Sequence, residues 1–546
     1  MSNWRTNVEA AAQAMDGAVI RSARHLASDV MVGGRISLDA LDGHQQAVYD
    51  LAFLASEAAA MRHVLAAHEQ RRLGEHTARR AAALLLRSAR TRIDGRQQAR
   101  GLEPDAVAGS QVQAVLAAGL DAANAERVLD EAADHGDAGL SDELRLAADV
   151  FRRFGEEQII PVAQDIHRTD GDVPEGVIVG LGALGAFGLS IPVEYGGSQD
   201  RDVPDHLAMV VATEELSRAS LGIGGSLITR PEILARALVK GGTEEQKRRW
   251  LPSIASGDLL VAVAVTEPNV GSDVASIRTE ALPREGGYAL RGAKMWCTFA
   301  GRAELLMVLA RTDPDPTQGY RGLSLVVVEK EAVPGHAFRL TQVGGGLMEG
   351  RAIPTMGYRG MHSFEVSFHE WRVPREALVG GDDSVGRGFP LQMAGFENGR
   401  LQTAARAIGV MQRAYDEAAG YAAGRSVFGQ PLSAYQLTRV RLGRMAATIQ
   451  ACRQFTYRVA RDVGSTDSAT MSALIKAYSC RAAEWVSRDA MQIHGGYGYA
   501  EEYPVSRVFV DARVLSIFEG TDEVLALKII GRQLLGQAVG VRTEWA

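Results

Sequence analysis

The sequence predicts a mainly helical protein with a central β domain, an α+β architecture, and three observations favour it. The chain has 546 residues, enough for three or four folding units at about 150 residues each. Apolar residues recur at helical spacing in the first and last parts of the chain. Short continuous or alternating apolar runs are concentrated from Leu259 to Val379, where a β-sheet is expected.

Residues 1–140 are expected to form an N-terminal helical extension. From Asp39 to Arg90 the chain is rich in Ala and Leu, contains no Pro and repeats apolar residues every three or four positions. Segments punctuated by Gly and Asp, 94–105 and 135–140, interrupt this pattern. No catalytic constellation is recognisable in this part. An arginine cluster is expected on a solvated helix face: Arg71, Arg72, Arg79 and Arg80.

Three further domains are expected: a helical one at 141–258, the β domain at 259–384 and a C-terminal helical one at 385–546. Ser141 followed by Asp-Glu predicts a helix start, and Thr243 with Gln246 has the spacing of a capping box. The β domain is expected to contain the apolar runs Leu305–Leu309, Leu323–Val328 and Phe364–Phe368. Long C-terminal helices are expected at Ala404–Ala423, Leu437–Val463 and Met471–Ile493.

The glycine-punctuated segment from Gly344 to Met361 is expected to be a long loop between two strands. Two interpretations stay open for it. It either shapes a binding pocket, as long loops often do, or merely connects the strands.

Composition and charge exclude several classes of protein. Apolar residues make up 46% and charged residues 23% of the chain, as in ordinary globular proteins. The apolar run Leu259–Val265 is far shorter than the roughly 20 residues of a membrane span. The net charge of −7, with interspersed signs, indicates no nucleic-acid surface. No signal-peptide pattern is present and the three cysteines cannot all pair, so a cytoplasmic location is expected. No metal is expected.

Five short motifs follow one another in the second half of the chain. They are Val265–Asp273 (VTEPNVGSD), Lys294–Thr298 (KMWCT), Arg425–Gly429 (RSVFG) with Gln436, Gln492–Gly496 (QIHGG) and Ile517–Thr521 (IFEGT). In this order, and over residues 141–540, they resemble the acyl-CoA dehydrogenase family. The resemblance implies the three-domain fold given above, FAD as cofactor and α,β-dehydrogenation of an acyl-CoA thioester.

The first four motifs are expected to bind FAD. A strand that ends at Thr266 can offer backbone amides and a hydroxyl to the flavin edge. Trp296 and Thr298 lie two apart on a presumed strand, so both should face the flavin, with Cys297 buried on the other face. The resemblance implies that Arg425 and Gln436 bind FAD of a neighbouring subunit. The expected cofactor residues are Val265, Thr266, Gly271, Ser272, Trp296, Thr298, Arg425, Phe428, Gln436, Gln492, Gly495, Gly496 and Thr521.

The fifth motif is expected to carry the catalytic base. Abstraction of an α-proton from a thioester requires a positioned carboxylate, and the resemblance assigns this role to Glu519, with hydride transfer from the β-carbon to flavin N5. Some relatives place the base just before the counterpart of Arg400, where this chain has Gly399. The substrate is expected to contact Ser272, Phe396, Arg400 and Gly520.

The substrate is expected to be (2S)-methylsuccinyl-CoA. The extension, the segment 350–365 (GRAIPTMGYRGMHSFE) and the chain length resemble the branch of the family that forms mesaconyl-CoA in the ethylmalonyl-CoA route. The free carboxylate of this substrate would need a cation or donors in the pocket, and the candidates are Arg230, Arg359 and His362.

Several alternatives stay open. A short- or branched-chain acyl-CoA dehydrogenase and an acyl-CoA oxidase share the expected fold and chemistry, and a non-catalytic assembly factor would share the fold alone. The expected electron acceptor is an electron-transferring flavoprotein. A homo-oligomer is expected, with a dimer preferred and a tetramer left open.

Overall fold

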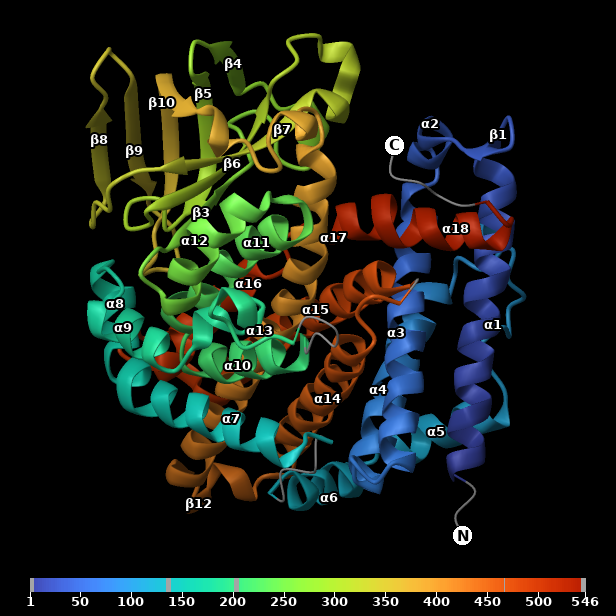
Figure 1. Ribbon diagram of the computed structural model, residues 1–546. Coiled ribbons are helices and arrows are strands. Elements are labelled where there is room, and N and C mark those ends of the chain that lie inside the picture. Colours follow the sequence, from blue (N-terminus) through green and yellow to red (C-terminus); the bar gives the residue numbers. More distant parts are fainter. Residues whose placement is uncertain (1–3, 134–138, 201–205, 466, 542–546) are drawn as a thin grey trace. The chain divides into compact units, whose positions relative to one another are not determined.

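The computed structural model describes residues 4–133, 139–200, 206–465 and 467–541. It confirms a mainly helical architecture with a β-sheet in the middle of the sequence (Figure 1). The chain divides into two compact units, 1–145 with 403–546 and 146–402. The N-terminal extension and the C-terminal helices therefore belong to one unit, although the whole of the other unit separates them in the sequence.

The extension consists of long helices, as the Ala- and Leu-rich pattern predicts. Its central helix is buried along most of its length, and the Asp50 carboxylate on it pairs with Arg96 at 2.7 Å and with the buried Arg100. Its elements are α1 (Trp4–Val30), β1 (Met31–Val32), β2 (Arg35–Ile36), α2 (Leu38–Asp42), α3 (Gln45–Glu69), α4 (Glu75–Ile93), α5 (Ser110–Leu120) and α6 (Ala122–Ala133).

The predicted arginine cluster is neither on one helix nor uniformly solvated, since Arg71 and Arg72 precede α4 and only Arg79 and Arg80 lie on it. Arg80 is only 3% exposed, and its Nη1 donates to the Gly119 carbonyl at 3.0 Å. A Cβ atom on Gly119 would lie 2.4 Å from Ala83 Cβ. The missing side chain thus lets α5 approach α4 closely, and this approach buries Arg80.

The last two long helices, α14 and α15, have nearly the predicted bounds, whereas α13 begins at Gly388, well before the predicted Ala404. These helices pack against the extension. The rings of His63 and Phe455 stack with centroids 4.5 Å apart, and the Arg481 guanidinium carbon lies 4.5 Å from the Phe53 ring centroid. The elements are α13 (Gly388–Gly424), β11 (Ser426–Val427), β12 (Gln430–Pro431), α14 (Gln436–Arg461), α15 (Ser468–His494), α16 (Pro504–Val514), α17 (Asp522–Val524) and α18 (Arg532–Ala538).

Helices α7 to α12 precede the sheet of the second unit. Leu144 N–H donates to Ser141 Oγ at 3.3 Å at the predicted helix start, and Thr243 and Gln246 form both hydrogen bonds of the predicted capping box. The helices are α7 (Asp142–Phe154), whose start lies in the first unit, α8 (Ile160–Thr169), α9 (Glu175–Ala183), α10 (His206–Ala219), α11 (Ser226–Gly241) and α12 (Glu244–Ser256).

Eight strands form the sheet, in the order β3-β6-β4-β5-β10-β9-β8, with β7 also paired to β6; Figure 1 shows β8, β9, β10 and β5 side by side. Strand β6 is buried on both faces. Its Leu306 and Val308 pack with residues of α8, α9 and α10, and its Leu305 and Met307 with residues of α11 and α12. This explains its continuous apolar sequence. The bounds are β3 (Val261–Ala264), β4 (Glu280–Arg284), β5 (Gly287–Thr298), β6 (Leu305–Arg311), β7 (Leu323–Glu329), β8 (Ala337–Thr341), β9 (Leu347–Ile353) and β10 (Ser363–Pro374).

The prediction of one long loop from Gly344 to Met361 is wrong for its first part. Strand β9 lies within this segment and pairs with both β8 and β10. Gly344 and Gly345, with φ of 99° and 96°, lie in the turn that joins β8 to β9. Gly350 interrupts the apolar alternation by which the strand could have been recognised. The missing side chain leaves room for the Phe338 ring, because a Cβ atom on Gly350 would lie 2.0 Å from it. Only the part after Ile353 connects two strands as a loop.

Two further expectations concern membrane spans and cysteine pairing. Among the described residues, no helix combines the length and the apolar character needed to cross a bilayer. The three cysteine thiols are free and buried, and burial raises the pKa of each to about 12.

Candidate active site

The first motif turns away from the end of β3, in the second unit. Met295 N–H of β5 donates to the Thr266 carbonyl at 2.7 Å, which holds the turn against the strand that carries the second motif. Val265 is buried, whereas Gly271 and Ser272 are exposed. A Cβ atom on Gly271 would first meet Thr266 Cγ2, at 3.9 Å. The backbone of this turn is therefore accessible to a ligand.

A buried ion pair fixes the same turn from inside. Lys294 Nζ, fully buried, lies 2.9 Å from Glu267 Oε1 and 3.0 Å from the Val265 carbonyl. The Glu267 carboxylate also accepts from the N–H groups of Arg278 and Thr279, both at 2.7 Å. Burial raises the pKa of Glu267, but the Lys294 ammonium and the two N–H donors outweigh it, and the pKa is lowered.

The second motif contains a β-bulge that changes the expected alternation. Phe364 pairs with Cys297 and Val366 with Lys294, so two residues of β5, the second being Trp296, lie opposite one residue of β10. Trp296 has φ 60° and is 54% exposed, whereas Thr298 is 5% exposed. The bulge thus turns the indole toward solvent while Thr298 is enclosed. Cys297 is buried, as predicted.

The end of β5 contacts the segment that follows β9. Thr298 Oγ1 lies 3.0 Å from Ser363 Oγ, and Phe299 N–H donates to the His362 carbonyl at 2.8 Å. Two of the three candidate cationic residues therefore lie in a segment bonded directly to the strand that carries Trp296 and Thr298.

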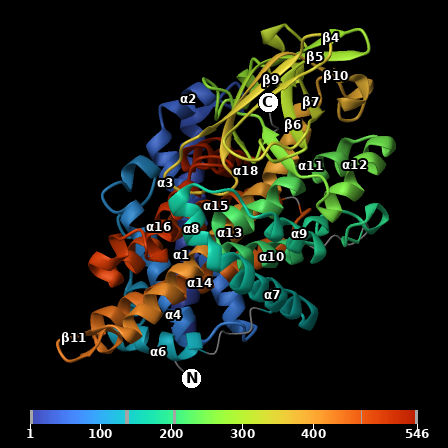
Figure 2. The same cartoon turned by 90° about the vertical axis from the view of Figure 1, so that its left-hand side faces the viewer.

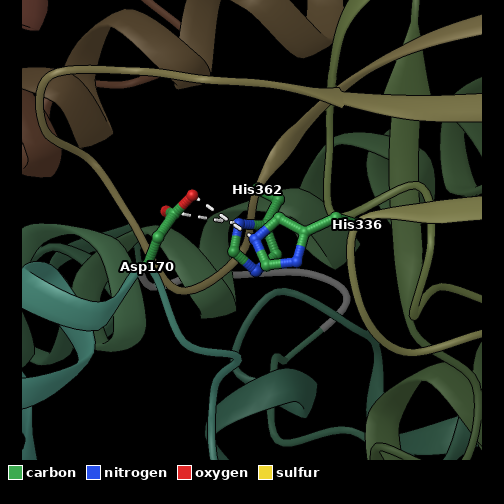
Figure 3. Close-up of side chains that lie close together, drawn as sticks. All are labelled: Asp170, His336 and His362. Carbon is green, nitrogen blue, oxygen red and sulfur yellow. Dashed lines mark ion pairs between the residues drawn. The ribbon is translucent and has the colours of Figure 1, made fainter.

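The three candidate cationic residues have different neighbours. Arg230 of α11 is 8% exposed, and its Nη2 donates to the Tyr358 hydroxyl at 3.0 Å. Arg359 Nε and His362 Nδ1 lie 3.6 and 3.7 Å from Asp170 Oδ1. Figure 3 shows the His362 ring beside Asp170.

Phe396 and Arg400 lie in the part of α13 that belongs to the second unit. Arg400 is buried and Phe396 half-buried, the latter packed against an apolar cluster that contains Ile233 of α11 and Trp250 of α12. Gly399, between them, offers no side-chain base.

Glu519 lies in the first unit, in a short turn between α16 and α17. Its φ is 55° and that of Gly520 is 95°, and an L-residue rarely adopts such a backbone without support. The support comes from Lys476 of α15, fully buried, whose Nζ donates to the Gly520 carbonyl at 2.7 Å. Thr521 Oγ1 accepts from Val524 N–H at 3.3 Å and caps α17. The turn is therefore fixed by contacts of the two residues that directly follow Glu519.

The third and fourth motifs meet elsewhere in the same unit. The Arg425 guanidinium carbon lies 5.9 Å from the ring centroid of Tyr497, which follows the glycine turn. Gly495 ends α15 with φ 62°, and no other described residue would lie within 4 Å of a Cβ on it or on Gly496. Gln436 and Gln492 are exposed.

Phe428 lies at the tip of the β11–β12 hairpin. It is 99% exposed and has φ 47°, followed by Gly429 with φ 84°, the two positive values that a tight hairpin turn needs. Figure 2 shows this hairpin extending beyond the ends of the helices that it joins.

The residues predicted to bind FAD fit a flavin dinucleotide chemically. Trp296 presents an exposed aromatic face, the glycines of both turns leave backbone donors accessible, and Arg425 supplies an exposed guanidinium that can pair with a diphosphate. Sequence reasoning missed the groups that hold these residues: Glu267, Lys294 and Lys476. Charged residues within otherwise apolar periodic runs, such as Lys476, are the signal that could have revealed them.

Comparisons with known proteins identify the family. Models of the acyl-CoA dehydrogenase N-terminal, middle and C-terminal domains match residues 141–258, 262–371 and 386–535. A (2S)-methylsuccinyl-CoA dehydrogenase of Cereibacter sphaeroides is 42% identical over 404 residues, which cover 74% of this chain and 71% of the relative. An acyl-CoA dehydrogenase of Bacillus subtilis (strain 168) is 35% identical over 71% of this chain and 96% of its own.

A solved structure gives the same result. Butyryl-CoA dehydrogenase from Megasphaera elsdenii superimposes with a TM-score of 0.66 and 31% identity, covering 72% of this chain and 99% of that one. The matched domains, the relatives and the fold agree with the five motifs. The chain belongs to the acyl-CoA dehydrogenase family, whose members are FAD-dependent oxidoreductases.

Proposed function

We propose that this enzyme converts (2S)-methylsuccinyl-CoA to mesaconyl-CoA with Glu519 as the base that removes the α-proton. The observation that carries the proposal is the fixed turn at Glu519, held in a left-handed conformation by the buried Lys476 and by the cap at Thr521. Backbone of this kind is retained where the surrounding structure over-determines it, as at active sites.

FAD, when bound, supplies the acceptor for the hydride that leaves the β-carbon, at N5. Val265, Thr266, Gly271, Ser272, Trp296 and Thr298 would hold the flavin end of the cofactor, and Arg425, Phe428, Gln436, Gln492, Gly495, Gly496 and Thr521 would contribute the remaining contacts. The protein itself binds and orients the reactants. Such positioning accounts for much of the rate acceleration in reactions of this kind.

Glu519 accepts the proton at a carboxylate oxygen. Its own backbone N–H would donate to the thioester carbonyl, whose oxygen gains negative charge as the α-proton leaves. Lys476 positions this N–H and the carboxylate through the Gly520 carbonyl. Ser272, Phe396, Arg400 and Gly520 would contact the remainder of the acyl-CoA.

Arg230 is the preferred partner of the free carboxylate of the substrate. It is buried and already hydrogen-bonded to the Tyr358 hydroxyl, so a second donor lies beside it. The printed name of the relative from Cereibacter sphaeroides supports methylsuccinyl-CoA as the substrate.

Replacement of Glu519 by Gln tests the mechanism. We expect Glu519→Gln to retain FAD and to lose bleaching of the flavin absorbance by methylsuccinyl-CoA by a factor on the order of 10³ or more. Glu523→Gln, an exposed carboxylate four positions later, is the matched control and should react like the wild type. Unchanged bleaching in FAD-loaded Glu519→Gln protein would refute the role of Glu519.

The substrate is tested by kcat/KM with methylsuccinyl-CoA and butyryl-CoA. The wild type should prefer methylsuccinyl-CoA. Arg230→Met should lose about 10² to 10³ in kcat/KM for this substrate, because an unpaired buried carboxylate costs several kcal/mol, and much less for butyryl-CoA. A wild-type preference for butyryl-CoA would contradict the substrate, whereas equal losses in Arg230→Met would contradict only the role of Arg230.

We further propose a homodimer that passes its electrons to an electron-transferring flavoprotein. The exposed Phe428 and Arg425 on and beside one hairpin support contacts with a second chain. Sedimentation velocity of the wild type and of Phe428→Ser tests this: a dimer is expected for the first and weaker association for the second.

A further inference from the structure

A cluster of three metal-ligating side chains lies in the second unit, outside the five motifs. Asp170 directly follows α8, His336 precedes β8, and His362 precedes β10. One potential ligand atom from each of them lies within 4.8 Å of the other two. Figure 3 shows the carboxylate of Asp170 directed toward both imidazole rings.

The spacing of these atoms suits a small divalent ion. His336 Nε2 lies 3.3 Å from Asp170 Oδ2, and His362 Nδ1 lies 3.7 Å from Asp170 Oδ1. Bonds of about 2.0–2.1 Å in a tetrahedral zinc site place neighbouring nitrogen and oxygen ligands roughly 3.4 Å apart. Small side-chain rotations would therefore close a coordination site.

A second carboxylate orients one of the rings. His362 Nε2, on the side opposite Nδ1, lies 2.8 Å from Asp172 Oδ1, and the ring is only 6% exposed. With the proton on Nε2, this contact leaves the lone pair of Nδ1 directed at Asp170. Metal-binding histidines usually donate their other N–H to a carboxylate in this way.

The surrounding charge favours a cation. The negative charges of Asp170 and Asp172 are partly balanced by the positive charge of Arg359. Its Nε lies 3.6 Å from Asp170 Oδ1 and donates to the Thr355 carbonyl at 3.0 Å. With neutral imidazoles the group has one net negative charge. His362 also has a left-handed backbone, with φ of 48°, a strain that often marks a functional site.

We propose that Asp170, His336 and His362 bind one divalent transition-metal ion, with Asp172 orienting His362. Two imidazoles and a carboxylate are ligands that suit zinc, whereas magnesium and calcium prefer oxygen alone. Water would complete the coordination. The ion would join the end of α8 to the segment that accepts a hydrogen bond from Phe299, and so would hold a helix to the end of β5.

The experiment is a calorimetric titration of EDTA-treated, FAD-loaded enzyme with ZnCl₂, with MgCl₂ as comparison. We expect one zinc per chain and no magnesium binding. His336→Ala and Asp170→Asn should each weaken binding at least about tenfold, and Asp172→Asn about 10- to 100-fold. His369→Ala removes an exposed histidine of β10 outside the cluster and should bind zinc like the wild type.

A direct localisation does not depend on the variants. Anomalous scattering at the zinc edge from soaked wild-type crystals should give a peak between Asp170, His336 and His362. A peak elsewhere, the absence of zinc binding at millimolar concentration, or undiminished binding by folded His336→Ala would overturn the proposal. Because His336 is exposed, its replacement should leave folding intact.

Discussion

Lys476 is a buried cation whose hydrogen bond fixes the turn of the proposed base. Its Nζ donates to the Gly520 carbonyl at 2.7 Å. Lys476→Met should lower kcat about 10- to 100-fold with little change in KM, because a hydrogen bond from a charged group contributes about 1.5–3 kcal/mol. Steady-state kinetics on FAD-loaded protein tests this. Lys476→Arg, which keeps the charge and donors, should recover part of the rate; equal kcat in Lys476→Met and wild type would show that the turn holds without it.

The Glu267–Lys294 pair leads to a stability prediction. Glu267→Gln leaves a buried ammonium without its carboxylate, which should destabilise the enzyme by about 3–5 kcal/mol. Because Lys294→Met in the same protein removes the unpaired charge, the double variant should regain part of the loss. Thermal denaturation measures both; an equally unstable double variant would contradict the explanation.

The same pair predicts a pH dependence. The folded-state pKa of Glu267 is lowered, so its contribution to stability is present above the unfolded pKa of about 4.3 and is lost as the pH falls through the lower folded value. Between pH 6 and pH 3 the wild type should therefore lose more stability than the double variant Glu267→Gln/Lys294→Met. Parallel melting curves across this range would refute the role of the carboxylate.

Individual site residues could be located from the sequence, but their contacts could not. Glu267 lies inside the first motif, yet its role in binding Lys294 depends on the pairing of strands distant in sequence. Trp296 and Thr298 were placed on one strand, but the bulge opposite β10 changed their exposure. The candidate zinc ligands come from three segments with no common motif, and no metal was expected from the sequence.

Among the structural elements, α14 approaches helix α6 of the extension closely. A Cβ atom on Gly443 would lie 2.4 Å from the Ala125 carbonyl of α6. Gly443→Ala should therefore push the two helices apart and destabilise the enzyme by about 1–3 kcal/mol. Gly420→Ala in α13 is the matched control: it is exposed, no other described residue would lie within 4 Å of its Cβ, and it should stabilise by about 0.5–1 kcal/mol. Equal melting temperatures of the two variants would contradict the close packing.

The accuracy of the predicted elements followed the strength of their periodicity. Helices α14 and α15 begin and end within three residues of the predicted bounds, because their apolar residues repeat over many turns. Strand β9 was missed because Gly350 and the charged Glu349 and Arg351 mask its alternation. Its pairing with both neighbours, a tertiary effect, makes it a strand.

For the whole molecule, the extension completes the C-terminal helices. Its α3 packs against α14 and α15 through His63, Phe53 and their partners. Deletion of residues 1–140 would expose these faces, so we expect the shortened chain to aggregate or to melt at least several degrees lower. Light scattering and calorimetry test this. Separately expressed residues 1–140 should restore solubility when coexpressed; a monodisperse shortened chain with the original melting temperature would contradict this role.

The grouping of residues 1–145 with 403–546 was beyond sequence reasoning. The sequence of an amphipathic helix shows that one face must pack against another element, but it does not show which element. Apolar faces of similar composition have the same sequence pattern. The β domain was different, since its short apolar runs between turn residues are typical of strands and favour a sheet.

The shielding of all three thiols makes the enzyme convenient for site-specific labelling. Their pKa values of about 12 and their burial leave almost no reactive thiolate at neutral pH. A single cysteine introduced at Phe428 would consequently be modified alone by a maleimide dye, without removal of any native cysteine. The emission of that dye would report directly whether a second chain covers the hairpin tip.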